Sequence, residues 1–168
     1  MKKRNLTIAI MIISVLFAIG YHKIQSARVN VETAISFFVK HDVNLDTYKL
    51  GIDFSKPVRV LHVKKGDKFI QYQIPGAPQG NFYALEGTTP SELGISEWGY
   101  DSEYELTVKK RARIYIATKD FKVLASYAAA VVDDWSTPED ETQTDGSKLQ
   151  LFTTCKPCFQ QKGIVYEN

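Results

Sequence analysis

The alternation of apolar and polar residues over short stretches is the feature of this sequence that most restricts its fold. Residues 58–63 (VRVLHV) and 69–74 (FIQYQI) follow this period of two, which is typical of β-strands, and the turn-forming residues 64–68 separate them. In the second stretch Gln71 and Gln73 share one face, and the apolar residues at 70, 72 and 74 share the other. The two stretches predict consecutive strands.

Further strand-like stretches follow without the regular alternation with helices that a parallel sheet requires. They cover residues 81–85, 111–117, 123–132 and 149–153. The run Thr89-Pro90-Ser91-Glu92 has the form of a capping box with proline at the first helical position, so it predicts the start of a short helix. We therefore expect one α+β domain, a compact and mainly antiparallel split β-sheet or sandwich with few helices.

One amphipathic helix is predicted ahead of the strands, over residues 30–41, with Asn30 as its N-cap. Because its polar face is short and not basic, we expect it to pack on the domain and not on a membrane. Its apolar positions recur at helical intervals: Val31, Ala34, Ile35, Phe38 and Val39.

The first 20 residues differ in composition from the rest of the chain. Three basic residues at positions 2–4 precede an apolar run from Leu6 to Gly20, and no cysteine follows that would mark a lipoprotein. A basic start followed by about fifteen apolar residues is typical of a signal peptide, and it is short for a membrane span of roughly 20 residues. We predict a signal peptide or N-terminal membrane anchor over residues 1–27. Residues 28–168 then form the exported domain, which is secreted, periplasmic or membrane-anchored.

The charge of that domain argues against a nucleic-acid partner. Without residues 1–20, 18 basic residues stand against 19 acidic ones, so the domain has no basic field. The sequence contains no GxSxG, HExxH, P-loop or GxGxxG motif. Its three histidines, His22, His41 and His62, are scattered, and no metal site is predicted.

The two cysteines, Cys155 and Cys158, form a CxxC motif after a strand-like stretch. This pattern is typical of a thioredoxin-type redox site. Only ten residues follow Cys158, however, which are too few to complete that fold. We favour a disulfide that fastens the C-terminal tail in an oxidising compartment.

Three polar features lie where a sheet of these strands would open into a cleft. They are the pair Gln71 and Gln73 beside the loop 75–80, the run 133–136 (DDWS), and Gln150 in the apolar last strand. Each has a plain alternative, because the glutamines can face solvent, the aspartates can cap a strand end, and Gln150 can be an edge residue. On the pattern alone these structural alternatives are the better interpretation.

Several stretches match the pattern of one known family: Lys68–Leu85, Thr88–Ile95, Val123-Leu124, Val131–Ser136 and Leu149–Thr153. Together they resemble the polymorphic toxin type 46 domain over roughly residues 57–154. The resemblance implies a fold similar to ADP-ribosyltransferases and hydrolysis of the nicotinamide–ribose bond of NAD or NADP. It also implies that a glutamine and an aspartate are essential, which fall on Gln71 and Asp134 here.

This reaction needs few catalytic groups. Nicotinamide in NAD is already a pyridinium cation and departs neutral, so no general acid is required, unlike in glycosidases that act on neutral sugars. Asp134 can stabilise the oxocarbenium-like ribose, and Gln71 or Gln150 can orient the ribose or the attacking water. NAD or NADP is the substrate, and no cofactor is expected. Tyr72 is expected to pack in the core, and further substrate contacts are expected from Gln73, Phe82, Tyr83, Trp135 and Ser136.

Two other functions remain open from the sequence. Mono-ADP-ribosyl transfer to a protein uses the same oxocarbenium step with a different nucleophile, and a membrane-anchored binding or immunity-type protein would keep the fold without the activity. Asp133 and Asp134 lie on opposite faces of a strand, so only one of them can point into a cleft. For an active toxin we expect a protein inhibitor that blocks the cleft.

Overall fold

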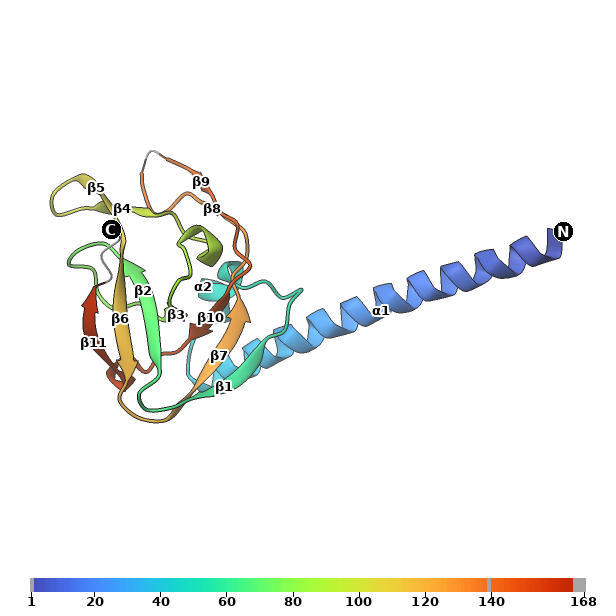
Figure 1. Ribbon diagram of the computed structural model, residues 1–168, viewed down its shortest axis with the longest axis horizontal. Helices are drawn as coiled ribbons and strands as arrows, with labels where there is room; N and C mark the ends of the chain where they lie inside the picture. Colours follow the sequence, from blue (N-terminus) through green and yellow to red (C-terminus); the bar gives the residue numbers. More distant parts are fainter. Residues whose placement is uncertain (1, 139, 165–168) are drawn as a thin grey trace.

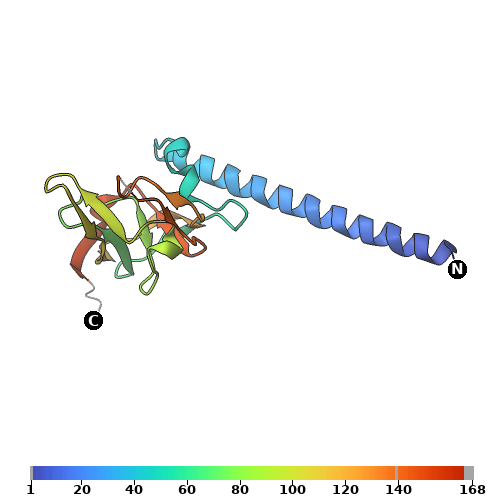
Figure 2. The ribbon, with the colours of Figure 1, turned by 90° about the horizontal axis from the view of Figure 1, so that it is seen from above.

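The computed structural model describes residues 2–138 and 140–164, with side chains from residue 19 onward. A long helix, α1 (Lys2–Lys40), projects from a β-rich domain, as Figures 1 and 2 show. Short helical turns connect the remaining elements: α2 (Leu45–Tyr48), η1 (Lys49–Gly51), η2 (Ser91–Leu93) and η3 (Lys156–Cys158).

Seven strands form the main sheet, in the order β1-β7-β10-β3-β2-β6-β11, and every neighbouring pair is antiparallel. This arrangement confirms the predicted α+β class with mainly antiparallel strands. Two smaller antiparallel ribbons, β4–β5 and β8–β9, accompany the sheet. The bounds are β1 (Arg59–Val63), β2 (Lys68–Gln73), β3 (Phe82–Ala84), β4 (Trp98–Asp101), β5 (Leu106–Lys109), β6 (Arg111–Ala117), β7 (Phe121–Tyr127), β8 (Val132–Asp133), β9 (Thr142–Gln143), β10 (Leu149–Phe152) and β11 (Phe159–Ile164).

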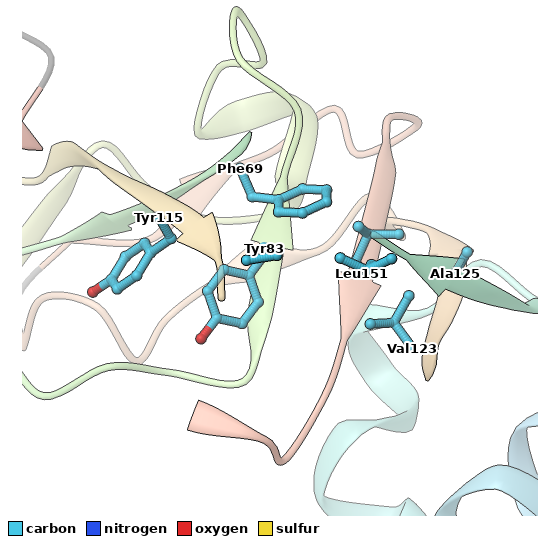
Figure 3. Packing of buried hydrophobic residues seen from close by; sticks show 8 residues of the cluster. Phe69, Tyr83, Tyr115, Val123, Ala125 and Leu151 are labelled. Atoms are coloured by element: carbon cyan, nitrogen blue, oxygen red, sulfur yellow. The ribbon is translucent and has the colours of Figure 1, made fainter. Parts of the chain in front are cut away.

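The main sheet carries an apolar layer on each face, because successive side chains of a strand point to opposite sides. The layer on one face contains Leu124 and Phe152. Phe38 of α1 packs on this layer, with its ring 4.8 Å from that of Phe152. The C-terminal end of α1 therefore covers this face of the sheet. Figure 3 shows the layer on the other face, which includes Phe69, Tyr83, Tyr115, Val123, Ala125 and Leu151.

The predicted capping box is present before η2. The backbone N–H of Thr89 donates to Oε2 of Glu92 over 2.9 Å, and the backbone N–H of Glu92 is 3.4 Å from Oγ1 of Thr89. The turn η2 confirms the predicted short helix, with Pro90 as its N-cap and not as its first helical residue.

The start of the amphipathic helix was predicted wrongly at Asn30. The helix runs on through this residue, because residues 21–29 contain no proline or glycine to break it. Asn30 is buried instead, where its Nδ2 donates to Phe54 O over 3.0 Å and its Oδ1 accepts from Val58 N over 3.0 Å. The side chain ties the helix to the chain that enters β1.

The predicted apolar face of this helix is partly wrong as well. Ile35 and Val39 are 42% and 73% exposed, whereas Phe37 is buried beside Phe38. The buried face follows Ala34, Phe37 and Phe38 because the helix contacts the sheet only along one narrow stripe.

The stretch 123–132 does not form one strand as predicted. β7 ends at Tyr127, and the chain leaves the sheet where Gly146 packs against it; a Cβ at Gly146 would lie 2.4 Å from the carbonyl carbon of Ala129. Val132 and Asp133 then pair with β9 in a separate ribbon. This separation moves the DDWS run away from the main sheet.

The predicted export segment is not tested by the structure, because Met1 and the side chains of residues 2–18 lie outside its description. Among the helices of the described residues, none has the length and apolarity that crossing a membrane requires. The division into residues 1–27 and 28–168 stays a prediction, and α1 continues through that boundary without a break.

Candidate active site

A cleft of about 690 Å³ opens where β2 and β3 diverge. The two strands pair only at Ile70 and Ala84, so the following residues of β2 have no strand beside them on that edge. Loops from three other parts of the chain close the cleft, around Gly51, Gly94 and Trp135. Its size falls within the range that small-molecule sites occupy.

Gln71 and Gln73 line this cleft and are both buried, so the interpretation that they face solvent is wrong. Gln71 bridges the gap between the strands, since its Nε2 donates to Phe82 O over 2.5 Å and its Oε1 accepts from Gly80 N over 2.8 Å. Gln73 donates to Oε1 of Gln71 over 2.6 Å and accepts from the hydroxyl of Tyr115 over 3.1 Å. One Nε2–H of Gln71 has no partner among the described residues.

The loop 75–80 forms one wall of the cleft and is held by side chains of the sheet. Gln73 donates to Pro78 O over 2.8 Å, and the guanidinium of Arg113 donates to Ile74 O over 3.0 Å. A Cβ at Gly80 would lie 3.0 Å from Nε2 of Gln71, so a glycine lets the loop approach the amide closely. These contacts give the wall a fixed position.

Gln150 of β10 lines the opposite side of the cleft. It is a central-strand residue between β7 and β3, so the interpretation as an edge residue is wrong. Its Nε2 donates to Gly51 O over 2.6 Å and lies 3.4 Å from Oγ of Ser126. Within the described residues Oε1 of Gln150 has no hydrogen-bond partner, and it is not a fully buried atom.

The predicted aromatic contacts differ in what they offer a ligand. Trp135 lines the cleft and is 60% exposed. Phe82 is half-buried and packs on Phe152, with ring centroids 5.2 Å apart. Tyr83 touches the cleft but is mainly a core residue, stacked on Phe159 at 4.2 Å, and burial raises the pKa of Tyr83 to about 12. Tyr72 also lines the cleft, and its hydroxyl donates to Thr88 O over 2.9 Å.

The two aspartates of the DDWS run have different surroundings. Asp134 is exposed and is not among the residues that line the cleft. Asp133 is fully buried and accepts from the backbone N–H of Ser96 over 2.6 Å and of Ser136 over 2.9 Å, and also from the Ser136 hydroxyl over 2.6 Å. Burial raises the pKa of Asp133, but these hydrogen bonds and the nearby Lys110 outweigh it and hold the pKa below its ordinary value.

Lys110 is a cleft residue that the sequence did not single out. It precedes β6, and its Nζ donates to the Ser136 hydroxyl over 2.6 Å and to Ser96 O over 3.0 Å. Burial lowers the pKa of Lys110, and the charge of Asp133 offsets this only in part. Its neighbours Lys109 and Arg111 give the same basic pattern in the sequence, so only the fold identifies it.

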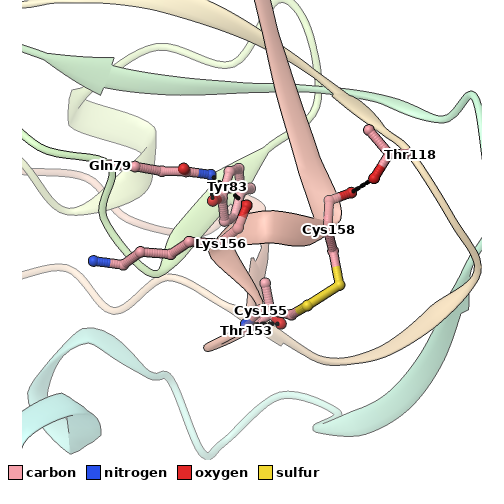
Figure 4. The surroundings of a disulfide bond; sticks show 7 residues. All are labelled: Gln79, Tyr83, Thr118, Thr153, Cys155, Lys156 and Cys158. Atoms are coloured by element: carbon pink, nitrogen blue, oxygen red, sulfur yellow. Dashed lines mark hydrogen bonds between the residues drawn. A yellow bond between two sulfur atoms is a disulfide. The ribbon is translucent and has the colours of Figure 1, made fainter.

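The two cysteines do not line the cleft, and Figure 4 shows their surroundings, which include Gln79 of the loop 75–80. Cys155 and Cys158 form a disulfide across η3. Cys158 O accepts from the backbone N–H of Thr118 over 2.8 Å, which fixes the start of β11 against β6. Gln79 of the cleft wall donates to the hydroxyl of Tyr83 and lies 3.5 Å from Lys156 O.

The structure thus brings together seven of the predicted site residues and leaves Asp134 outside. Among the described residues, no group of three or more histidine, cysteine or acidic side chains is arranged to hold a metal ion. The seven that line the cleft are Gln71, Gln73, Phe82, Tyr83, Trp135, Ser136 and Gln150.

The fold and the cleft can now be compared with known proteins, and the comparisons point to a class of bacterial toxin domains. The chain belongs to the bacterial toxin 46 family, whose model matches residues 20–159. It is 38% identical over 136 residues to the NAD(P)(+) glycohydrolase toxin Tse6 of Pseudomonas aeruginosa. The matched part is 79% of this chain and 32% of that protein, so the chain spans about a third of the length of this curated relative.

The solved structure of this relative agrees with the assignment. The structure of Tse6 in complex with Tsi6 superposes with a TM-score of 0.70 at 36% identity, covering 84% of this chain and 98% of that chain. The structure of Rhs1-CT in complex with its cognate immunity protein RhsI1 gives a TM-score of 0.43 at 13% identity, over 64% and 78% of the two chains.

Proposed function

We propose that this chain hydrolyses the nicotinamide–ribose bond of NAD or NADP, the activity that the name of its relative Tse6 states for that protein. The observation that carries the proposal is the meeting of Gln71, Gln73 and Gln150 in one cleft, within the part of the chain that the toxin family model matches. In the reaction, water adds to the ribose carbon and nicotinamide leaves neutral with the bonding electron pair. The products from NAD are nicotinamide, ADP-ribose and one proton, and NADP yields the 2′-phosphate of ADP-ribose in place of ADP-ribose.

The two amides have complementary capacity for this step. The remaining N–H of Gln71 can donate to a ribose hydroxyl, and Oε1 of Gln150 can accept from a hydroxyl or from the attacking water. Both side chains are already held by backbone partners, so they bind substrate with little further loss of entropy. Ser136 and Gln73 support the positions of their neighbours and face the same cleft.

The carboxylate of the proposal is Asp134. It directly precedes Trp135, a residue of the cleft mouth, and we expect substrate binding to bring the turn 133–136 over the ribose. A negative charge there would stabilise the oxocarbenium-like transition state. Asp133 is the competing candidate, because it lies buried beneath the same turn. Trp135 would then stack on a base of the substrate, with Phe82 and Tyr83 forming the deeper wall.

Export and inhibition by a partner belong to the same proposal. The basic residues at positions 2–4, the apolar run after them and the disulfide favour passage into an oxidising compartment. Because the relative Tse6 has been solved in complex with Tsi6, we expect a protein inhibitor for this chain too. The likeness to ADP-ribosyltransferases stays part of the proposal.

The test is to incubate the purified chain with NAD and to measure free nicotinamide and free ADP-ribose. Equal amounts of both are expected. No release of nicotinamide would overturn the proposal, while ADP-ribose bound to protein would replace it with the transferase. Gln150→Met and Gln71→Met should each lower kcat/KM about 100-fold.

Matched controls separate catalysis from folding. Gln161→Met, an exposed glutamine of β11 outside the cleft, should retain the activity. Asp134→Asn should lose it with an unchanged melting temperature. If Asp134→Asn is fully active, the carboxylate of the proposal is wrong.

A further inference from the structure

The cleft is nearly uncharged apart from one lysine. Within the described part of the chain, Lys110 is the one residue with a charged side chain among those that line the cleft, and no carboxylate lines it. Both NAD and NADP carry negative charges on their phosphate groups. A cleft that takes such a molecule needs a group to meet that charge.

The ammonium of Lys110 is fixed in place with donor capacity left over. A protonated lysine has three N–H donors. The Ser136 hydroxyl and Ser96 O take two of them, at 2.6 and 3.0 Å, and no third acceptor is present among the described residues. The backbone N–H of Lys110 also donates to Glu97 O over 2.7 Å, which anchors the base of the side chain.

The one buried carboxylate near this lysine has its own donors. Both oxygens of Asp133 accept hydrogen bonds from Ser96, Trp135 and Ser136. Its contact with Lys110 runs through the Ser136 hydroxyl. Asp133 therefore does not consume the remaining donor of the lysine.

We infer that Lys110 binds a phosphate group of the substrate through its remaining N–H, an assignment that rests on the proposed function. The group is either the pyrophosphate that NAD and NADP share or the additional 2′-phosphate of NADP. A charge-assisted hydrogen bond to phosphate is roughly twice as strong as a neutral one. Burial of the charged ammonium costs free energy, and for this reason it lowers the pKa of Lys110. An anion bound at this place offsets that cost.

A binding experiment tests the inference without the reaction. ADP-ribose, which keeps the pyrophosphate, and adenosine, which has no phosphate, are titrated into the full chain and into Lys110→Met. If Lys110 contacts the pyrophosphate, ADP-ribose should bind at least tenfold more weakly to the variant, and adenosine should bind equally to both. Equal affinity of both proteins for ADP-ribose would overturn the inference for the pyrophosphate, and NADP kinetics decide the 2′-phosphate.

The kinetic arm uses NAD, NADP and nicotinamide riboside. A pyrophosphate contact raises KM for both dinucleotides in Lys110→Met, a 2′-phosphate contact raises it for NADP alone, and neither changes kcat/KM for nicotinamide riboside. An equal loss for the riboside, or unchanged KM for both dinucleotides, contradicts the inference. Lys110→Arg should restore part of the affinity, since it restores the charge.

Two further comparisons keep the outcomes distinct. Lys109→Met is the matched control, because Lys109 forms a salt bridge of 3.3 Å with Glu97 and does not line the cleft. If the wild-type chain hydrolyses no NAD but its binding of ADP-ribose depends on Lys110, the proposed function fails and the phosphate site stands.

Discussion

Buried polar side chains determine the shape of the cleft at the scale of single residues. Tyr115, Gln73 and Gln71 form a continuous chain of hydrogen bonds that ends at Phe82 O. A single buried hydrogen bond contributes only about 1 kcal/mol net, but an unpaired buried donor or acceptor costs about 1–3 kcal/mol. Each amide is therefore held in one orientation, because any other leaves a polar atom without a partner.

Asp133 offers a prediction at this scale. Asp133→Asn replaces one acceptor oxygen with an amide nitrogen facing N–H and O–H donors, so we expect the free energy of unfolding to fall by about 2–3 kcal/mol at pH 7. The pKa of Asp133 is held below its ordinary value of 3.8, so its contribution is present above that pH and is lost as the pH falls through the lower, folded value.

Urea unfolding of both proteins between pH 7 and pH 2.5 measures this effect. The difference in unfolding free energy should stay constant down to about pH 4 and then shrink. A difference that grows on acidification would contradict the assignment.

The sequence allowed prediction of some site residues but not others, for physical reasons. Period-two alternation and the family pattern were sufficient to select Gln71, Gln73 and Gln150. The position of Asp134 depends on where the chain leaves β7, and Gly146, which is distant in sequence, packs against the backbone there. Lys110 could not be separated from Lys109, because only the fold shows which lysine faces the cleft.

At the scale of elements, the cleft exists because β2 and β3 share a single residue pair. The loop 75–80 carries the chain away from β2 and is fastened back to the sheet by Gln73 and Arg113. A tighter hairpin would continue the pairing and leave no cleft. The family motif in this region therefore encodes the interruption of the sheet as well as its amides.

The disulfide gives the prediction at this scale. Replacing both Cys155 and Cys158 with serine should lower the free energy of unfolding by about 2 kcal/mol, since the closed loop has only four residues. The melting temperature should fall by about 4–8 °C. A reductant should lower the melting temperature of the wild type to the same extent and leave the variant unchanged, as thermal unfolding with and without the reductant would reveal.

The last strand shows why some elements could not be predicted. β11 reads Phe-Gln-Gln-Lys-Gly-Ile, with four polar or glycine residues in a row and no alternation. It forms because β6 presents an edge and because Phe159 fills a place between Tyr83 and Phe121. Those partners come from elsewhere in the chain, so the residue pattern of 159–164 does not indicate that this segment forms a strand.

At the scale of the whole molecule, α1 has two parts with different roles. Its last three turns pack on the sheet through Ala34, Phe37 and Phe38, whereas Tyr21, Ile24 and their neighbours are exposed. Figure 2 shows the N-terminal part extending away from the domain. The stability of the domain should depend only on the C-terminal part of α1, which packs on the sheet.

This division predicts different outcomes for two changes in the same helix. Phe38→Ala should lower the free energy of unfolding by about 3–5 kcal/mol, because the buried ring leaves a cavity beside Phe152. Removal of residues 2–27 should change the melting temperature of the domain by less than about 2 °C. A large loss of stability on truncation would show that the projecting part supports the domain, and thermal unfolding of both variants decides this.

The unbroken course of α1 through residue 27 has a geometric consequence. An α-helix advances about 1.5 Å and turns about 100° per residue. If the N-terminal end is held by a membrane or a delivery protein, the number of residues in the helix sets the direction in which the cleft faces. One residue inserted in the exposed part of the helix would rotate the opening of the cleft about the helix axis by about a quarter of a circle.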